Sequence, residues 1–277
     1  MSLTVEVAGK TDIGCVRKNN EDNLGWDQRL GLYIVCDGMG GALAGEVASK
    51  MGVELVLDYF RQGQASGIYP DFGDSPGDIS PSGRHLASAI QRANAAIFEA
   101  GQAKQSQHGM GSTIVCLIIN DNFMTIAHAG DSRIYRLRDG VLEQLTQDHS
   151  LVMEQYRRGL ITLEQAEQSD MQNIIIKALG SEDKVEPDVQ DLIAFRDDTY
   201  LLASDGLTKL VKDDTIKNIL LNSPSLDRAC EDLISAAKQK GGDDNITCLL
   251  LRVLEEPWYR KLFNALQGGG QSWRNSS

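Results

Sequence analysis

Four aspartates stand where an apolar segment of the chain meets a turn: Asp37, Asp131, Asp205 and Asp244. Each lies next to glycine or a small polar residue. A single aspartate at such a place is ordinary turn chemistry, because its side chain accepts hydrogen bonds from nearby backbone N–H groups. Four such positions are harder to attribute to turns alone. Because the ends of neighbouring strands can converge, the pattern also predicts a cluster of carboxylates.

Such a cluster would need cations. Two carboxylates ~4 Å apart repel each other by roughly 4 kcal/mol at an effective dielectric constant near 20. Carboxylate and carbonyl oxygens favour Mg²⁺, Mn²⁺ or Ca²⁺ over zinc or copper. Two such ions ~3.5–4 Å apart can share a water, lower its pKa and stabilise an oxyanion. Hydrolysis of a phosphate monoester, which is very slow without a catalyst, fits this chemistry.

A phosphate substrate would also require a cationic side chain from the protein. The segment after the first predicted strand contains Arg17 and Lys18. Arginine can bind phosphate through two parallel hydrogen bonds, whereas lysine acts as a point charge. Spacing alone does not separate these two residues, and an ordinary surface role remains open for both.

The elements that must position these residues are mainly short strands. The apolar and alternating segments predict strands at residues 3–8, 32–36, 113–119, 123–128, 133–138, 141–145, 199–203 and 246–253. Asp139-Gly140 predicts a tight hairpin, because both residues tolerate positive φ. Most of these strands are joined by short turns, which favours antiparallel pairing.

Amphipathic helices alternate with these groups of strands. Apolar residues at helical spacing predict helices at 45–60 and 84–104, and a third that begins after Ser225. Residues 64–83 are expected to form a surface loop. The polar region 145–180 should contain short helices and could cover a cleft. Strands and helices in this order predict sheets packed together with helices outside.

The composition excludes some classes of function. The chain has 277 residues and a formal net charge of −12, without the basic stripe that nucleic-acid binding requires. No apolar run is long enough for a membrane helix, and we expect no secretory signal. The five cysteines show no Cys-x-x-Cys pair, and the four histidines show no zinc spacing. We therefore expect reduced thiols and a cytoplasmic monomer.

Six short motifs occur in one order between residues 7 and 253. They are Arg17 with Glu21-Asp22, Asp37-Gly38-Met39-Gly40-Gly41, Gly111-Ser112-Thr113, Gly130-Asp131-Ser132-Arg133, Ser204-Asp205-Gly206-Leu207 and Gly241-Gly242-Asp243-Asp244-Asn245-Ile246-Thr247. This ordered set resembles the type 2C family of metal-dependent protein phosphatases in its bacterial form. The resemblance implies an α+β, four-layer fold with two central antiparallel sheets and pairs of helices outside.

The resemblance also implies a set of metal ligands for Mn²⁺ or Mg²⁺. Asp37 would bridge two central ions, and Gly38 would offer its carbonyl oxygen. Asp205 and Asp244 would complete one of these sites. Asp131, together with Asp205, would hold a third ion.

Further roles follow from the same resemblance. Glu21 and Asp22 would contact waters bound to the ions, Arg17 would bind the phosphate, and Asn245 would support Asp244. A water shared by two ions would attack phosphorus in line, without a covalent phosphoenzyme. Many eukaryotic members carry histidine where this chain has Met39. The acid for the leaving alkoxide is therefore left open between a metal-bound water and Asp22.

The expected organisation is a catalytic domain at 1–254, with residues 145–180 as the flap near the active site. The tail at 255–277 could form a short amphipathic helix, packed on its own domain or docked on a partner or membrane. Phosphorylated proteins would be the substrates, with a serine/threonine kinase as a partner. Two alternatives remain: a non-catalytic regulator that binds phosphoproteins, and a hydrolase of small phosphomonoesters.

Overall fold

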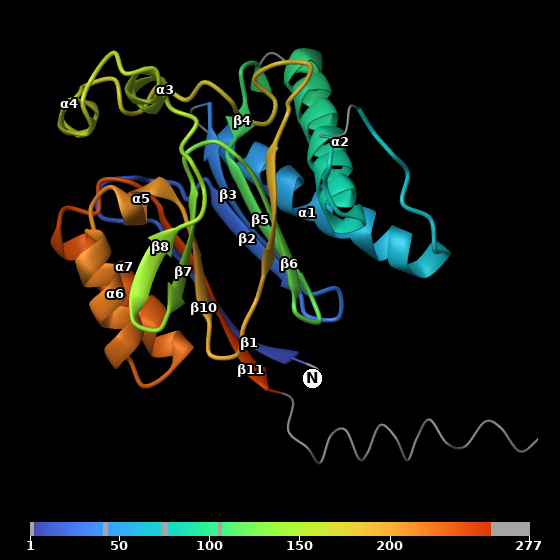
Figure 1. Ribbon diagram of the computed structural model, residues 1–277. Coiled ribbons are helices and arrows are strands. Elements are labelled where there is room, and N and C mark those ends of the chain that lie inside the picture. The colour runs from blue at the N-terminus through green and yellow to red at the C-terminus, as the bar shows by residue number, and fades with distance from the viewer. Residues whose placement is uncertain (1–2, 41–43, 74–76, 105–106, 256–277) are drawn as a thin grey trace, which may run out of the picture.

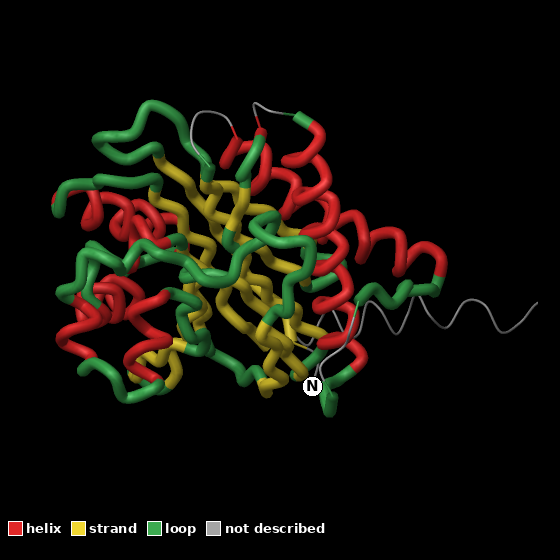
Figure 2. Tube along the Cα trace, turned by 90° about the horizontal axis from the view of Figure 1, so that it is seen from above, coloured by secondary structure: helices red, strands yellow, loops and turns green. Residues whose placement is uncertain are grey.

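The computed structural model describes residues 3–40, 44–73, 77–104 and 107–255. Two antiparallel sheets lie face to face in the centre, and helices cover their outer faces (Figures 1 and 2). The predicted four-layer α+β sandwich is confirmed. Residues 256–277, which include almost all of the predicted tail, lie outside the described part of the chain.

The first sheet consists, in spatial order, of β1 (Leu3–Asp12), β11 (Ile246–Glu255), β10 (Thr199–Ala203), β7 (Arg133–Arg138) and β8 (Val141–Gln144). The second consists of β2 (Asp22–Asp27), β3 (Leu32–Met39), β5 (Ile114–Asn120), β6 (Phe123–Ala129) and β9 (Asp188–Ile193), and the short β4 (Gly111–Ser112) pairs with the end of β3. Every one of these pairs is antiparallel.

The helices lie on opposite sides of the two sheets (Figure 1). α1 (Ala44–Ser66) and α2 (Pro81–Ala103) cover the second sheet, whereas α6 (Asp213–Asn222) and α7 (Leu226–Gln239) cover the first. The short α5 (Asp205–Thr208) directly follows β10. α3 (Leu151–Arg157) and α4 (Leu163–Glu167) form the helical part of the flap, at the upper left of Figure 1.

The central strands read as continuous apolar runs because both of their faces are buried. In β3, Tyr33 and Val35 belong to the core between the sheets, together with Leu249 of β11. Ile34 and Cys36, on the other face, belong to the core under α1 and α2. No helix among the described residues is long and apolar enough to cross a membrane.

Most predicted strands are found within one or two residues of their expected ends, although β1 extends four residues further. The Asp139-Gly140 hairpin is confirmed, because both residues have positive φ and Arg138 pairs with Val141. The hydroxyl of Ser225 caps α7 by accepting a hydrogen bond from the backbone of Arg228.

Several elements differ from the sequence-based prediction. β2, β9 and α6 were not predicted, because their sequences are rich in polar residues. α1 continues to Ser66, so the expected surface loop at 64–83 begins as helix. β3 continues through Asp37-Gly38 to Met39, because pairing with β4 extends the strand. Asp37 is therefore within a strand and not after one.

Candidate active site

One end of the sandwich contains a cavity of about 590 Å³. It is lined by seven of the nine predicted site residues: Arg17, Glu21, Asp37, Gly38, Asp205, Asp244 and Asn245. The other two are buried beside it. Asp22 pairs with Asp37 between β2 and β3, and Asp131 forms an ion pair with Lys209, which also lines the cavity. The structure therefore brings all nine residues to one place.

Both sheets contribute carboxylates to this site. Asp22 begins β2, and Asp37 lies near the end of the neighbouring β3. In the first sheet, Asp205 follows β10, and Asp244 lies two residues before β11, which pairs with β10. Because the two sheets are stacked, the ends of these strands meet at the same end of the sandwich.

Two glycines allow backbone segments to approach closely at the site. A Cβ atom on Gly38 would lie 2.1 Å from the carbonyl oxygen of Gly45, and one on Gly206 would lie 2.0 Å from that of Asn245. No side chain fits at such distances. The glycines after Asp37 and Asp205 are therefore required by the packing of α1 and β11.

The charges of the cluster act against one another. Burial raises the pKa of the Asp37 carboxyl well above its usual range, and the charges of Asp22, Asp205 and Asp131 raise it further. Burial raises the pKa of Asp22 to about 7 and that of Asp131 to about 6, with a further contribution from Asp205 in each case. Neighbouring carboxylates thus favour protonation unless a cation neutralises them.

Several carboxylate oxygens are buried without a hydrogen-bond partner within the described part of the chain. They are Oδ1 of Asp22, both Oδ atoms of Asp131 and Oδ1 of Asp205. Ionised carboxylates only accept hydrogen bonds, and a buried unpaired oxygen is costly. Hard divalent cations bind such oxygens, so the donor set fits Mg²⁺ or Mn²⁺.

Ser204 connects the two sheets beneath the site. Its hydroxyl donates to Oδ2 of Asp22 at 2.7 Å and accepts from the backbone of Thr247 at 3.0 Å. Ser204 and Thr247 lie in the first sheet region, whereas Asp22 begins β2 of the second. This fully buried serine therefore fixes Asp22 relative to β10 and β11.

Threonine and serine side chains fix the backbone of Asp37. Thr113 Oγ1 accepts a hydrogen bond from the Asp37 N–H at 3.1 Å, and lies 2.7 Å from the hydroxyl of Ser132. The hydroxyl of Ser112 donates to the Asp37 carbonyl oxygen at 3.0 Å. These residues of two sequence motifs orient Asp37 and place Asp131 beside it.

Asn245 holds the segment that carries Arg17. Its side-chain amide donates to the carbonyl oxygens of Ile13 and Asn19, and its Oδ1 accepts from the backbone of Glu21 at 2.8 Å. Its backbone N–H donates to Oδ1 of Asp244 at 2.8 Å. The side chain thus organises the loop before β2, while the contact with Asp244 comes from the backbone.

Arg17 itself lies at the mouth of the cavity. Its Nη2 donates to Oδ2 of Asp244 at 2.7 Å, and its side chain is more than half exposed. The exposed guanidinium is thus held by one partner and has other N–H groups that can bind an anion.

The chain can now be compared with known proteins. The family model described as protein phosphatase 2C matches residues 16–251. The chain belongs to the protein phosphatase 2C family. It is 38% identical over 245 residues to the serine/threonine phosphatase stp of Listeria monocytogenes, which covers 87% of this chain and 93% of that protein. The predictions of this family and of a serine/threonine phosphatase are confirmed.

Solved structures of the family agree with the fold. The Mycobacterium tuberculosis serine/threonine phosphatase PstP/Ppp gives a TM-score of 0.78 at 34% identity, covering 91% of this chain and 99% of that one. The catalytic domain of PstP in complex with two manganese ions gives 0.77 at 33% identity, covering 92% and 100%.

Lys209 is a site residue that the sequence analysis did not identify. Its ammonium lies 2.5 Å from Oδ2 of Asp205, 3.4 Å from Oδ2 of Asp131 and 2.7 Å from Oδ1 of Asn173 in the flap. Burial lowers the pKa of Lys209, but the two carboxylates outweigh it and raise the pKa overall. The spacing of Asp205 and Lys209, four residues apart at a helix, is a local signal for their ion pair. No spacing rule links this pair to Asp131 or Asn173, which lie far away in the sequence.

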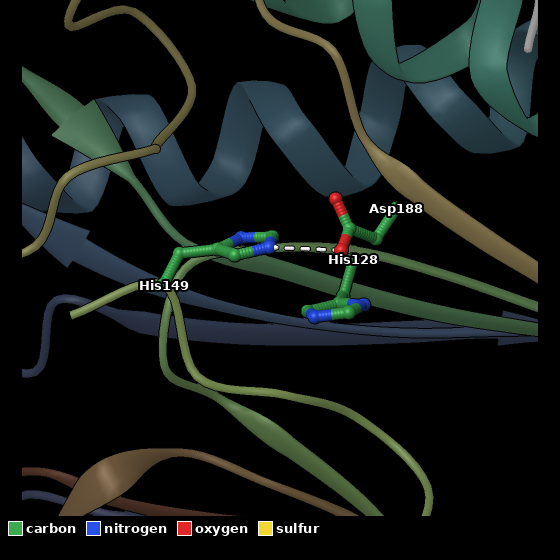
Figure 3. Close-up of side chains that lie close together, drawn as sticks. All are labelled: His128, His149 and Asp188. Atoms are coloured by element: carbon green, nitrogen blue, oxygen red, sulfur yellow. Dashed lines mark ion pairs between the residues drawn. The ribbon is translucent and has the colours of Figure 1, made fainter. Parts of the chain in front are cut away.

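The structure also groups three residues that the sequence leaves scattered: His128, His149 and Asp188 (Figure 3). Nδ1 of His149 accepts from the Gly130 N–H at 3.1 Å, so the neutral ring carries its proton on Nε2, which lies 3.2 Å from Asp188. Nε2 of His128 lies 2.9 Å from the carbonyl oxygen of Gln147 and donates to it.

A metal ion does not fit this histidine group well. The two rings stack with centroids 4.6 Å apart and planes inclined by 6°. A ligated ion lies close to the plane of each imidazole, and two stacked parallel rings share no such position. The His149 ring accepts a hydrogen bond from the Gly130 N–H, and the backbone N–H of His149 donates to the Gly130 carbonyl oxygen. We interpret the group as an anchor that attaches the start of the flap beside Asp131.

Proposed function

We propose that this protein hydrolyses phosphoserine and phosphothreonine esters on proteins by means of a metal-activated water. The observation that supports it most is the buried aspartate cluster, whose oxygens without a hydrogen-bond partner lie at or beside the cavity that Arg17 lines. This donor set suits divalent cations, and the family is one of protein phosphatases. The non-catalytic alternative is not favoured, because every predicted ligand position is filled.

The ligands proposed for the two central ions line the cavity. Asp37 would serve two central ions, with Asp205, Asp244 and the Gly38 carbonyl completing their coordination. Mn²⁺ or Mg²⁺ would acidify a water and neutralise the phosphate when bound. A third ion would be held by Asp131 together with Asp205. The two manganese ions of the related PstP structure support the choice of metal.

The remaining residues prepare the site and bind the substrate. Arg17 would bind the phosphate oxygens at the mouth of the cavity, where its guanidinium is exposed. Glu21 and Asp22 would hold waters at the ions. Asn245 positions Arg17 and Glu21 through the loop that it holds.

We propose phosphorylated proteins as substrates, with a serine/threonine kinase as the opposing partner and no role for nucleic acid. All five cysteines lie in the described residues and are free thiols. Free thiols support a reducing, cytoplasmic location. We propose that the protein acts there as a monomer.

Phosphate release from a phosphothreonine peptide tests the proposal. Turnover is expected with Mn²⁺ or Mg²⁺, and none with EDTA. Asp37→Ala should abolish it, while Asp214→Ala on the exposed start of α6 is the matched control. Folded, metal-loaded protein without turnover would contradict the proposal. A panel of phosphotyrosine peptides and small phosphomonoesters separates protein dephosphorylation from general phosphomonoesterase activity.

A further inference from the structure

A lysine side chain lies between two of the proposed metal ligands. Lys209 directly follows the short α5, and its ammonium lies 2.5 Å from Asp205 and 3.4 Å from Asp131. The Asp131 side chain is 4% exposed and that of Asp205 16%, whereas that of Lys209 is 29% exposed. The ammonium therefore reaches the buried carboxylates from the open side of the cavity.

The same ammonium also reaches the flap. It donates to Oδ1 of Asn173 at 2.7 Å, and Asn173 lines the cavity together with Ile175. Lys209 donates hydrogen bonds to Asp205 and to the flap residue Asn173, and its charge also forms an ion pair with Asp131. One side chain thus connects the charge of the site with the segment that contains α3 and α4.

We propose that Lys209 acts as an internal cation at Asp131 and Asp205, where it competes with the third divalent ion. Because the same ammonium holds the flap through Asn173, binding of the ion and attachment of the flap oppose each other. The inference rests on the proposed function for the location of that ion. Lys209 is a positioning residue in this scheme and does not act on the substrate.

Competition follows from charge and space. A divalent ion bound by Asp131 and Asp205 would lie where the ammonium now contacts both carboxylates, and the two cations would repel each other. Binding of the ion therefore requires the ammonium to move away, which breaks its hydrogen bond to Asn173. Because linkage is reciprocal, attachment of the flap through Asn173 must weaken binding of the ion by the same factor.

Calorimetric titration with Mn²⁺ tests the competition on protein first stripped with EDTA. Lys209→Met removes the charge and keeps most of the aliphatic chain. We expect the weakest Mn²⁺ site of this variant to bind at least roughly tenfold more tightly than that of the wild type. A cation this close to a carboxylate typically shifts the proton affinity of that carboxylate by roughly tenfold or more, and we expect a similar effect on its affinity for Mn²⁺. Lys209→Arg should keep the weak site, and Lys212→Met, on an exposed side chain nearby, should match the wild type.

Asp131→Asn locates the affected site. Added to Lys209→Met, it should remove the tightened Mn²⁺ binding. An unchanged weakest affinity in Lys209→Met, or tight binding that survives Asp131→Asn, would overturn the proposal.

Hydrogen exchange of the flap tests the coupling without any measurement of turnover. Without Mn²⁺, both Asn173→Ala and Lys209→Met should exchange faster than the wild type in α3 and α4. Saturation of the weakest site with Mn²⁺ should raise the exchange rate of α3 and α4 in the wild type. It should leave the exchange rate of these helices in Asn173→Ala unchanged. A wild-type flap that does not respond to this Mn²⁺ would refute the coupling. Inactive protein with the expected binding and exchange would refute only the proposed function.

Discussion

Replacing Asp22 by asparagine should stabilise the metal-free protein at neutral and mildly alkaline pH. The Asp22 side chain is almost fully buried, and only its Oδ2 receives a described hydrogen bond, from Ser204. Asparagine has nearly the same shape and keeps an oxygen for this hydroxyl. The substitution therefore removes an ionisable group while changing the packing little.

The magnitude follows from the pKa of this carboxyl. Burial, together with the charges of Asp205 and Asp244, raises it to about 7, against an ordinary value of 3.8. Between these values the folded state keeps a proton that the unfolded state has released, so stability falls as pH rises through this window. A shift of about 3 units corresponds to about 4 kcal/mol at 1.36 kcal/mol per unit. Asparagine cannot ionise and escapes this loss.

Urea unfolding followed by circular dichroism, in EDTA, provides the assay. Wild type and Asp22→Asn are compared from about pH 4, where the carboxyl is protonated in the folded state, to about pH 8, where it is ionised. The difference at the acidic end measures any packing cost of asparagine. Between the acidic and the alkaline end, the free energy of unfolding of the variant should rise by about 4 kcal/mol relative to that of the wild type.

Addition of Mn²⁺ should reverse this preference, because a cation stabilises the ionised cluster of the wild type more than that of the variant. Parallel pH dependences of wild type and variant in EDTA would refute the reasoning, since they would show that Asp22 does not carry an unfavourable charge in the folded state.

Three further predictions concern other residues. Asp205→Ala should lose more phosphatase activity than Asp131→Ala, because Asp205 is proposed to serve two ion sites; equal losses would argue against a shared ligand. Arg17→Ala should lower kcat/KM for a phosphopeptide about 10- to 100-fold, the usual effect of a lost charged hydrogen bond, and an unchanged value would remove Arg17 from phosphate binding. Burial lowers the pKa of His128 from 6.5 to about 4, so its neutral ring contributes stability above pH 6.5 that is lost as pH falls towards 4. Wild type should therefore lose about 3 kcal/mol more than His128→Gln over this range, measured by urea unfolding.

The parts of the fold that could be predicted are those with a strong local signal. Strands such as β10 are apolar on both faces, and the Asp139-Gly140 turn has residues that tolerate positive φ. Half of the residues in β2 and in β9 are polar, and neither strand has such a signal. They are strands because each pairs along its whole length with a buried neighbour, β3 or β6. Such long-range pairing is not encoded in either segment alone.

The same distinction applies to the site. The aspartates could be predicted, because each lies beside a glycine or a small polar residue and its turn chemistry is local. Ser204 and Thr113 act through hydrogen bonds to residues far away in sequence, and Lys209 acts where three separate segments meet. Their roles depend on the relative placement of the two sheets and the flap, which short sequence patterns do not specify.

The site gathers several carboxylates that repel one another, and the rest of the fold must keep them together. The core between the sheets, the Ser204 bridge and the loop held by Asn245 keep the carboxylates together. In the metal-free protein this arrangement costs stability, and any cation that binds the folded state alone restores it. Lys209 supplies one such charge from within the chain. A variant that removes a buried carboxylate, at Asp22 or at Asp131, should therefore bind cations more weakly. The same variant should be more stable than the wild type when no metal is bound.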